Sequence, residues 1–266
     1  MKVYVINLAS STERMAAIQS HLEGMGLAFE RVEAVWGKAL STEELDRLYS
    51  PTSNRQRFYR PMSAGEIGCY ASHLRLWQML VSQAVPMALV LEDDMELDRR
   101  TPELLQALQT LESLDSLRSP AGDWDMIKLI GMRPAEASRA WPLVEGFDLV
   151  DCKRLPSLTG AYVIRLTGAT KLAGRAAPFS RPIDVELRHH WEFGLKVLAV
   201  DPYPAREAPT AHLTTIGFSR KLSGAERWRK WRYQFRYSVL NAWHRCRRWV
   251  AERRAHSDRV HNPSPP

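Results

Sequence analysis

The sequence is short of cysteine and of long apolar runs. Its 266 residues include three cysteines, Cys69, Cys152 and Cys246, which stand far apart and form no CxxC pair. An odd number of widely spaced cysteines argues against both a disulfide framework and a cysteine zinc site. Runs of about 18 apolar residues, as a membrane span needs, are absent, and the N-terminal apolar run ends at Ser10, too early for a signal-peptide core. We therefore expect a cytoplasmic protein that does not span a membrane.

The positive charge is concentrated near the C-terminus. The formal net charge is +7, but twelve Lys and Arg stand against two Glu between Ser219 and Arg254, a local balance of +10 that leaves −3 for the rest. We expect a mildly acidic, enzyme-sized domain over residues 1–215, a basic helical extension over 216–254 and a disordered end over 255–266.

Apolar and amphipathic stretches alternate along the first domain. Strands are expected at 2–8, 29–35, 86–94, 125–131, 162–166 and 196–202. Helices are expected at 12–26, 41–49, 64–83, 101–114 and 184–193, with a polar loop over 50–63. Ser10 with Glu13, and Ser41 with Glu44, have the spacing of capping boxes. The alternation predicts an α/β fold with a Rossmann-type, mainly parallel sheet flanked by helices.

Three consecutive carboxylates, Glu92, Asp93 and Asp94, follow the apolar run at 86–91. Such a run is typical of a strand buried on both faces, and α/β folds bind ligands at the carboxyl ends of such strands. Adjacent carboxylates repel one another unless a cation shares the site, and Mn²⁺ and Mg²⁺ prefer oxygen ligands. The alternative is a solvated acidic turn that precedes a helix.

Five segments, in this order, make the chain similar to glycosyltransferase family 25. They read VINLASSTER, GEIGCYASHLRLW, ALVLEDDMEL, TGAYVIRLTGATKL and RPID, and they cover roughly residues 2–185. The family comprises bacterial lipooligosaccharide-type galactosyltransferases and their relatives, the collagen galactosyltransferases. The resemblance implies a GT-A-like fold, a divalent metal held by an acidic DxD-like motif, a UDP-sugar donor and an inverting transfer.

The resemblance also implies roles for individual residues. Asp94 is the expected direct metal ligand, with Glu92 as a further candidate, and Glu92 or Asp93 is expected to contact the ribose or the metal's waters. His212 lies beyond the matching segments and is a candidate metal or phosphate ligand by analogy with histidines of other GT-A enzymes. Asp184, in RPID, is expected to act as base or acceptor anchor, with Glu186 as the alternative. The donor pocket is expected to include Asn7, Ser11, Arg14, Glu66, Ser72 and His73. The TGAY segment is expected to shape the sugar pocket, because small residues allow close backbone approach.

Ordinary structural roles remain open for several of these residues. Ser11 also suits a helix cap, Arg14 a solvated surface charge and His73 a buried structural histidine. Asp184 and Glu186 also suit the first turn of a helix, where acids are favoured. Two other functions stay open for the whole chain. One is a non-catalytic basic protein that binds membrane or nucleic acid, and the other is a metal-dependent phosphohydrolase that uses the same acids.

The basic extension has an apolar stripe. On a helix its members recur at steps of three or four and lie within about 80° of one face. They are Trp228, Trp231, Phe235, Val239, Ala242, Cys246 and Trp249. Aromatic side chains at the acyl boundary and arginines on anionic head groups predict an enzyme that is peripheral at the inner membrane face, with a lipid-linked glycan as acceptor. Packing on the enzyme's own core and binding of nucleic acid, the least favoured partner, remain alternatives.

Overall fold

The computed structural model describes residues 1–113, 123–209 and 223–261. The chain forms two compact units, Met1–Ser219 and Arg220–Pro266. This division lies close to the boundary that the charge distribution predicts at residue 215.

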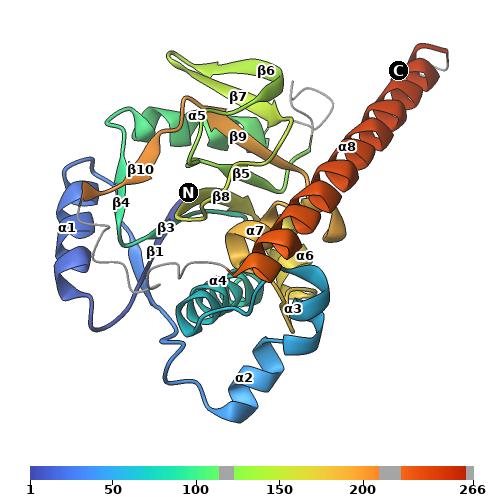
Figure 1. Ribbon diagram of the computed structural model, residues 1–266. Helices are drawn as coiled ribbons and strands as arrows, with labels where there is room; N and C mark the ends of the chain where they lie inside the picture. Colours follow the sequence, from blue (N-terminus) through green and yellow to red (C-terminus); the bar gives the residue numbers. More distant parts are fainter. Residues whose placement is uncertain (114–122, 210–222, 262–266) are drawn as a thin grey trace. The chain divides into compact units, whose positions relative to one another are not determined.

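An eight-stranded sheet forms the middle of the first unit (Figure 1). The strand order is β2-β1-β3-β8-β5-β9-β7-β6. The strands are β1 (Lys2–Asn7), β2 (Glu30–Glu33), β3 (Met87–Glu92), β5 (Met126–Lys128), β6 (Ala137–Val144), β7 (Phe147–Cys152), β8 (Ala161–Arg165) and β9 (Val197–Asp201). The pairings make β7 and β8 run opposite to the other six. The expected α/β class, with a mostly parallel sheet, is confirmed.

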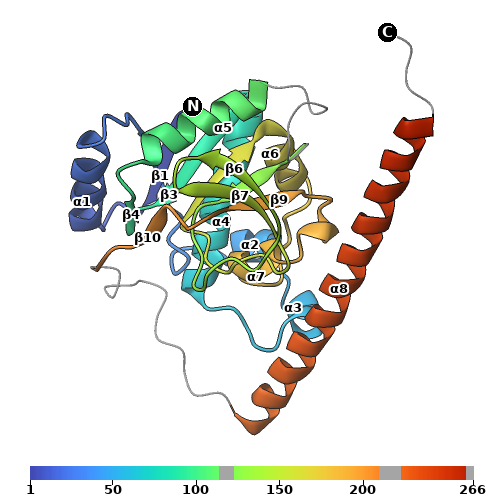
Figure 2. The same cartoon turned by 90° about the horizontal axis from the view of Figure 1, so that it is seen from above.

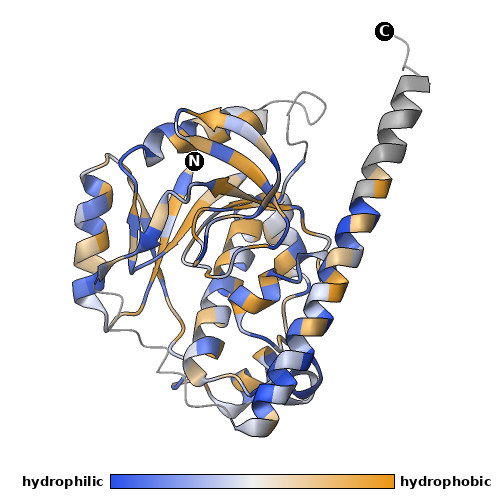
Figure 3. Ribbon diagram, turned by 45° about the horizontal axis from the view of Figure 1, so that its top comes forward, coloured by the Kyte–Doolittle hydropathy of each residue, from blue (hydrophilic) through white to orange (hydrophobic). Residues whose placement is uncertain are grey.

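Helices cover both faces of this sheet (Figure 2). One face packs against α1 (Thr12–Glu23) and α5 (Thr101–Ser113), and the other against α4 (Ala64–Ser82), α6 (Leu166–Ala173) and α7 (Ile183–Leu187). Because successive strand residues point to opposite faces, Val3 and Val5 of β1 join the first layer while Tyr4 and Ile6 join the second. Figure 3 shows the apolar colour along the strands of the sheet between these layers.

Two short strands bring a late segment of the chain to the acidic triplet. β4 (Met95–Leu97) follows the carboxylates and pairs antiparallel with β10 (Ala205–Glu207). The backbone N–H of Ala208 donates to the carbonyl of Asp94 over 2.7 Å. Asp93 and Asp94 therefore form a turn between β3 and β4, and the helix that follows, α5, begins only at Thr101.

Local capping signals agree with the structure at one helix and not at another. α2 (Thr42–Leu48) begins with the predicted capping box of Ser41 and Glu44. The predicted box of Ser10 and Glu13 is wrong, because α1 has Ser11 as its N-cap residue and no side-chain cap bond. The Ser11 hydroxyl instead accepts a hydrogen bond from Arg14.

The polar segment at 50–63 contains a helix that the sequence analysis places in a loop. α3 (Pro51–Arg57) begins with proline in its first turn, and the Ser50 hydroxyl accepts from the Ser53 N–H. Proline at this position and serine at the cap both favour a helix start. The prediction of a loop over 50–63 is therefore wrong for residues 51–57, because Ser50 and Pro51 together favour the start of a helix.

The second unit consists of one long helix, α8 (Gly224–His261). Residues 255–261, expected to be disordered, continue this helix, whereas 216–222 and 262–266 lie outside the described residues. None of the described helices combines the length and the apolar character needed to cross a membrane.

Close backbone packing between α4 and the segment after β2 gives a first prediction. A Cβ atom on Gly68 would lie 2.5 Å from the Val35 carbonyl oxygen and 2.7 Å from the Gly37 nitrogen. Gly68→Ala should therefore lower the free energy of unfolding by about 1–3 kcal/mol, measured by chemical denaturation. Gly24→Ala is the control, because its Cβ meets backbone atoms no nearer than 3.4 Å. Equal stability of the two variants would contradict the close packing.

Candidate active site

The acidic triplet lies where the carboxyl ends of two parallel strands meet. Ile6 of β1 pairs with Glu92 of β3, so Asn7 and Asp93 follow at the same edge of the sheet. On the other side of β3, the Glu92 N–H donates to the Gly160 carbonyl over 2.8 Å. The Met95 side chain packs against Gly160, where an added Cβ would lie 2.6 Å from the Met95 sulfur.

Asp93 is held on both oxygens by other side chains. Asn7 Nδ2 donates to Oδ2 over 2.6 Å, and Arg14 Nη1 lies 3.2 Å from Oδ1. Burial raises the pKa of Asp93, while the amide of Asn7 and the charge of Arg14 act in the opposite direction. Arg14 also donates to the Ser11 hydroxyl over 2.9 Å. The structure thus places three residues expected in the donor pocket around Asp93. Asn7 and Arg14 contact its carboxylate directly, and Ser11 contacts Arg14.

Asp94 has a buried oxygen that the described protein leaves without a partner. Its Oδ1 has no hydrogen-bond partner among the described residues, and Oδ2 lies 3.9 Å from Arg14 Nη1. Burial, followed by the charges of Glu92 and Asp93, raises the pKa of Asp94 to about 7. A buried carboxylate oxygen with no donor beside other carboxylates fits a hard divalent cation.

Glu92 is oriented by a chain of hydrogen bonds that starts inside the core. Trp77 Nε1 donates to the Tyr162 hydroxyl over 3.0 Å, and that hydroxyl lies 2.8 Å from His73 Nδ1. His73 Nε2 lies 3.3 Å from Glu92 Oε1. Because an indole N–H can only donate, the Tyr162 proton is available to His73 Nδ1, which leaves the Nε2 proton for Glu92. His73 is therefore a buried histidine that orients the Glu92 carboxylate by donating a hydrogen bond to it.

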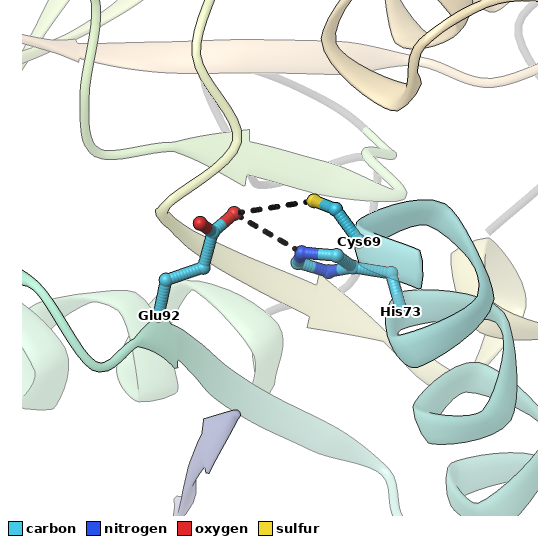
Figure 4. Close-up of side chains that lie close together, drawn as sticks. All are labelled: Cys69, His73 and Glu92. Carbon is cyan, nitrogen blue, oxygen red and sulfur yellow. Dashed lines mark hydrogen bonds and ion pairs between the residues drawn. The ribbon is translucent and has the colours of Figure 1, made fainter. Parts of the chain in front are cut away.

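Cys69 points at the same carboxylate (Figure 4). Its Sγ lies 4.0 Å from Glu92 Oε1, and one ligand atom from each of Cys69, His73 and Glu92 lies within 4.8 Å of the others. Burial, followed by the charge of Glu92, raises the pKa of the Cys69 thiol well above its usual range. This favours a protonated thiol beside Glu92, and leaves the Glu92 and Asp94 oxygens as the ligands best suited to Mn²⁺ or Mg²⁺.

Two cavities meet at the triplet. The first, of about 110 Å³, and the second, of about 630 Å³, share Cys69, Glu92 and Asp94 as lining residues. Further residues of the first cavity include Arg14, Trp36, Gly37, Lys38, Ser72 and His73. Further residues of the second cavity include Glu66, Thr159, Gly160, Asp184 and Glu207. The carboxylates thus form the wall between a smaller and a larger compartment.

The two carboxylates considered for the base have different surroundings. Asp184, in the first turn of α7, lines the second cavity, and burial raises its pKa while Lys128 acts to lower it. Glu186 lines neither cavity, and both its oxygens accept from Arg181, over 2.6 and 2.8 Å. A carboxylate held in a buried ion pair is a poor proton acceptor. The expectation of Glu186 as a base is therefore corrected, and Asp184 is retained.

Glu66 and Ser72 shape the cavity walls through bonds to the protein itself. Glu66 completes the capping box of α4 with Ser63 and binds Arg60 with both oxygens, over 2.6 and 2.8 Å. The Ser72 hydroxyl accepts from the Val35 N–H over 2.8 Å and donates to the Gly68 carbonyl. His212 lies outside the described residues.

The TGAY segment lines the second cavity through Thr159 and Gly160, and the buried Thr159 hydroxyl has no partner among the described residues. Four other residues had not been expected at the site. Trp36 and Lys38 line the first cavity, Glu207 lines the second, and the buried Lys128 lies behind the wall of the second. An aromatic beside Gly37 was a weak signal for Trp36. Glu207 had no local signal, because the pairing of β10 with β4 brings it to the site.

Taken together, the sheet and the acids between two cavities describe an α/β protein with a candidate ligand site at the carboxyl edge of its sheet. The chain belongs to glycosyltransferase family 25, because the family model described as Glycosyltransferase family 25 (LPS biosynthesis protein) matches residues 1–187. The expected family is thereby confirmed.

Curated relatives agree with this family. A Glycosyltransferase 25 family member of Anopheles gambiae is 31% identical over 191 residues, which cover 69% of this chain and 30% of that protein. Procollagen galactosyltransferase 2 of Homo sapiens is 31% identical over 191 residues, which cover 70% and 29%. The chain thus spans about 30% of the length of these relatives.

Solved structures of low sequence identity are also similar, and one of them is the crystal structure of a glycosyltransferase involved in the glycosylation of the major capsid of PBCV-1. The similarity covers 76% of this chain and 82% of that chain, with 11% identity and a TM-score of 0.39.

The hydrogen bonds behind Glu92 give a second prediction. Tyr162→Phe removes the acceptor of the Trp77 N–H and the donor to His73, so it should lower the free energy of unfolding by about 1–3 kcal/mol. The His73 ring should also lose its preference for the Nε2 proton, which ¹⁵N NMR of the imidazole measures. Tyr203→Phe is the control, because the Tyr203 hydroxyl has no partner among the described residues. An unchanged ¹⁵N spectrum of His73 in Tyr162→Phe would contradict the placement of the proton on Nε2.

Proposed function

We propose that the chain is a metal-dependent glycosyltransferase that moves a hexose, with galactose as the first candidate, from a UDP-sugar to a lipooligosaccharide or related glycan. The observation that carries the proposal is the buried, unpartnered Asp94 oxygen at the wall between two cavities. Membership of glycosyltransferase family 25 supports the reaction class. The name of the human relative, a procollagen galactosyltransferase, supports galactose.

The residues fit a divalent cation. Asp94 and Glu92 would hold Mn²⁺ or Mg²⁺, because their oxygens are hard ligands at the meeting point of the cavities. When bound, such a cation stabilises the negative charge that develops on the departing diphosphate. Asp93, already held by Asn7 and Arg14, fixes the backbone between the two ligands.

The first cavity suits the nucleotide. Arg14 and Lys38 bring positive charge to it, and Ile6, Leu8 and Val35 add apolar surface. The Trp36 side chain is 58% exposed and lines this cavity, so its ring is available to stack on uracil. A UDP placed here has its diphosphate beside Glu92 and Asp94 and its sugar directed toward the second cavity.

The second cavity suits the sugar and its acceptor. It is the larger of the two, and its carboxylates can accept hydrogen bonds from sugar hydroxyls. An inverting transfer needs a base that takes the proton of the attacking hydroxyl on the face opposite the leaving group. Asp184 supplies a half-buried carboxylate in this compartment, and its raised pKa strengthens it as a proton acceptor.

Release of UDP distinguishes this function from its two rivals. The purified chain should release UDP slowly from UDP-galactose with Mn²⁺ and faster once a glycan acceptor is added. A phosphohydrolase would cleave simple phosphate esters without needing an acceptor. A non-catalytic binding protein would release nothing, and either result would refute the proposal.

Asp94→Asn gives the third prediction. The substitution removes a negative oxygen ligand and changes little volume, so the fold should persist while turnover falls by about a hundredfold or more. Steady-state kinetics at limiting Mn²⁺ and circular dichroism measure the two effects. Asp98→Asn is the matched control, because Asp98 lines neither cavity of the site. Wild-type turnover in Asp94→Asn would remove Asp94 from the metal site.

We further propose that α8 binds an anionic bilayer, which would place the enzyme at the inner face of the membrane beside a lipid-linked acceptor. Five large apolar side chains at helical spacing are at least half exposed: Trp228, Trp231, Phe235, Val239 and Trp243. Trp243 adds to the stripe expected from the sequence, and the Trp249 side chain lies outside the described residues.

Arginines of α8 lie over two of these exposed rings. Arg232 lies over the Trp228 ring at 5.1 Å and Arg247 over the Trp243 ring at 4.7 Å. This pairing of aromatic rings with cations suits the head-group region.

A full-length variant tests the membrane proposal and gives the fourth prediction. Replacing Trp228, Trp231 and Phe235 by Ser should strongly reduce sedimentation with phosphatidylserine-containing vesicles, because aromatic burial is lost. Each basic residue near an anionic surface is worth about 1 kcal/mol, so salt should weaken binding of the wild type.

Transfer to a soluble acceptor should stay unchanged in this variant, since the proposed catalytic residues lie in the first unit. Unchanged vesicle binding would overturn the bilayer proposal. Binding of single-stranded oligonucleotides in preference to vesicles would identify nucleic acid as the partner. Light scattering is the control for this experiment. If the variant remains monomeric, aggregation is excluded as the cause of a loss of vesicle binding.

A further inference from the structure

Lys128 is a fully buried lysine that no proposed step uses. It ends β5, in the interior of the sheet, and its exposed fraction is 0%. Its ammonium donates to the carbonyl oxygen of Pro156 over 3.0 Å and to that of Leu158. In the described part of the chain both hydrogen-bond partners are thus neutral backbone groups of one segment. Burying a charge is costly, so such a placement suggests a role beyond packing.

The segment that Lys128 holds forms a wall of the second cavity. Leu158 has a φ of 69°, in the left-handed region that a branched side chain rarely adopts. Leu158, Thr159 and Gly160 all line the cavity. The Gly160 carbonyl also accepts from the Glu92 N–H over 2.8 Å. The two bonds from Lys128 therefore fix an unfavourable turn that connects the cavity wall to the acidic triplet.

The charge of Lys128 acts on the same cavity. Five carboxylates line it: Glu66, Glu92, Asp94, Asp184 and Glu207. Burial lowers the pKa of Lys128 to about 8, and Asp184 and Glu92 act to raise it. In turn Lys128 and Arg188 lower the pKa of Asp184, against its burial and the charge of Glu66. A buried cation thus offsets part of the repulsion in the compartment assigned to the acceptor.

We propose that Lys128 is a positioning residue for the acceptor side of the site, which clamps the turn before Thr159 and Gly160 and keeps a buried positive charge behind this wall of the second cavity. The proposal rests on the function proposed above for the second cavity. It assigns two separable roles to one side chain: hydrogen bonds that hold the wall, and a charge that favours the ionised form of Asp184.

Two substitutions separate these roles and give the fifth prediction. Lys128→Met removes both the bonds and the charge, so acceptor kcat/KM should fall by about tenfold or more. Loss of the cation raises the pKa of Asp184, so the acid limb of the kcat profile should move to higher pH. Lys128→Gln keeps a donor for the carbonyls and should recover part of the loss in acceptor KM while the acid limb stays shifted. UDP affinity with Mg²⁺, measured by calorimetry, should remain that of the wild type in both variants.

Lys171→Met is the matched control, because Lys171 pairs with Asp125 over 2.7 Å and lines neither cavity. Hydrogen exchange of the Glu92 amide adds a measure that needs no activity: it should be faster in Lys128→Met than in the control. Unchanged exchange together with control-like acceptor kinetics would overturn the proposal. If Lys128→Met fails to fold, Lys128→Gln decides through its acid limb. Absence of transfer by the wild type would refute the proposed function alone, since the exchange measurement would still test the clamp.

Discussion

Three carboxylates side by side at the buried end of β3 repel one another, and much of the site is arranged around that repulsion. Asp93 forms an ion pair with Arg14 and accepts a hydrogen bond from the amide of Asn7. Glu92 accepts from His73, which is itself fixed by Tyr162. Asp94 keeps a buried oxygen without a described partner. Within the described residues the protein thus provides side-chain partners for Asp93 and Glu92 but not for this Asp94 oxygen, which is why we propose a cation held by Asp94 together with Glu92.

The fold explains why these partners meet. The parallel pairing of β1 with β3 places Asn7 beside Asp93, and α1 begins close enough to supply Arg14. α4 packs across the same face and carries His73, while antiparallel β8 brings Tyr162 next to β3. The triplet therefore forms a fixed wall between two compartments, and the proposed donor and acceptor sites share the same carboxylates. A sugar that passes from one site to the other would move across this wall.

Much of this arrangement could be predicted from the sequence because its signals are local. The apolar run before Glu92 predicted β3, and the spacing of Ser41 and Glu44 predicted the start of α2. Chemical type alone was less informative. Glu186 was a candidate base only because it is a carboxylate near Asp184, and its pairing with Arg181 shows in the packed structure.

Contacts between segments far apart in the sequence explain why other site residues were not predicted. Glu207 reaches the site through the pairing of β10 with β4, and Lys128 meets the turn at Pro156 across the end of the sheet. No periodicity or capping signal reports such contacts, because each partner is ordinary in its own segment. The sequence therefore predicts the acidic triplet better than the side chains that hold it in place.

Saturation-transfer NMR with UDP-galactose detects donor binding without requiring the acceptor, and so tests whether Asp94 and Glu92 bind a UDP-sugar through a cation. With Mg²⁺ present, we expect saturation of the uracil, ribose and galactose protons, and loss of most of that signal when the ion is chelated. Equal saturation with and without Mg²⁺ would contradict the assignment of Asp94 and Glu92 to a cation. Absence of saturation under both conditions would contradict the UDP-sugar site itself.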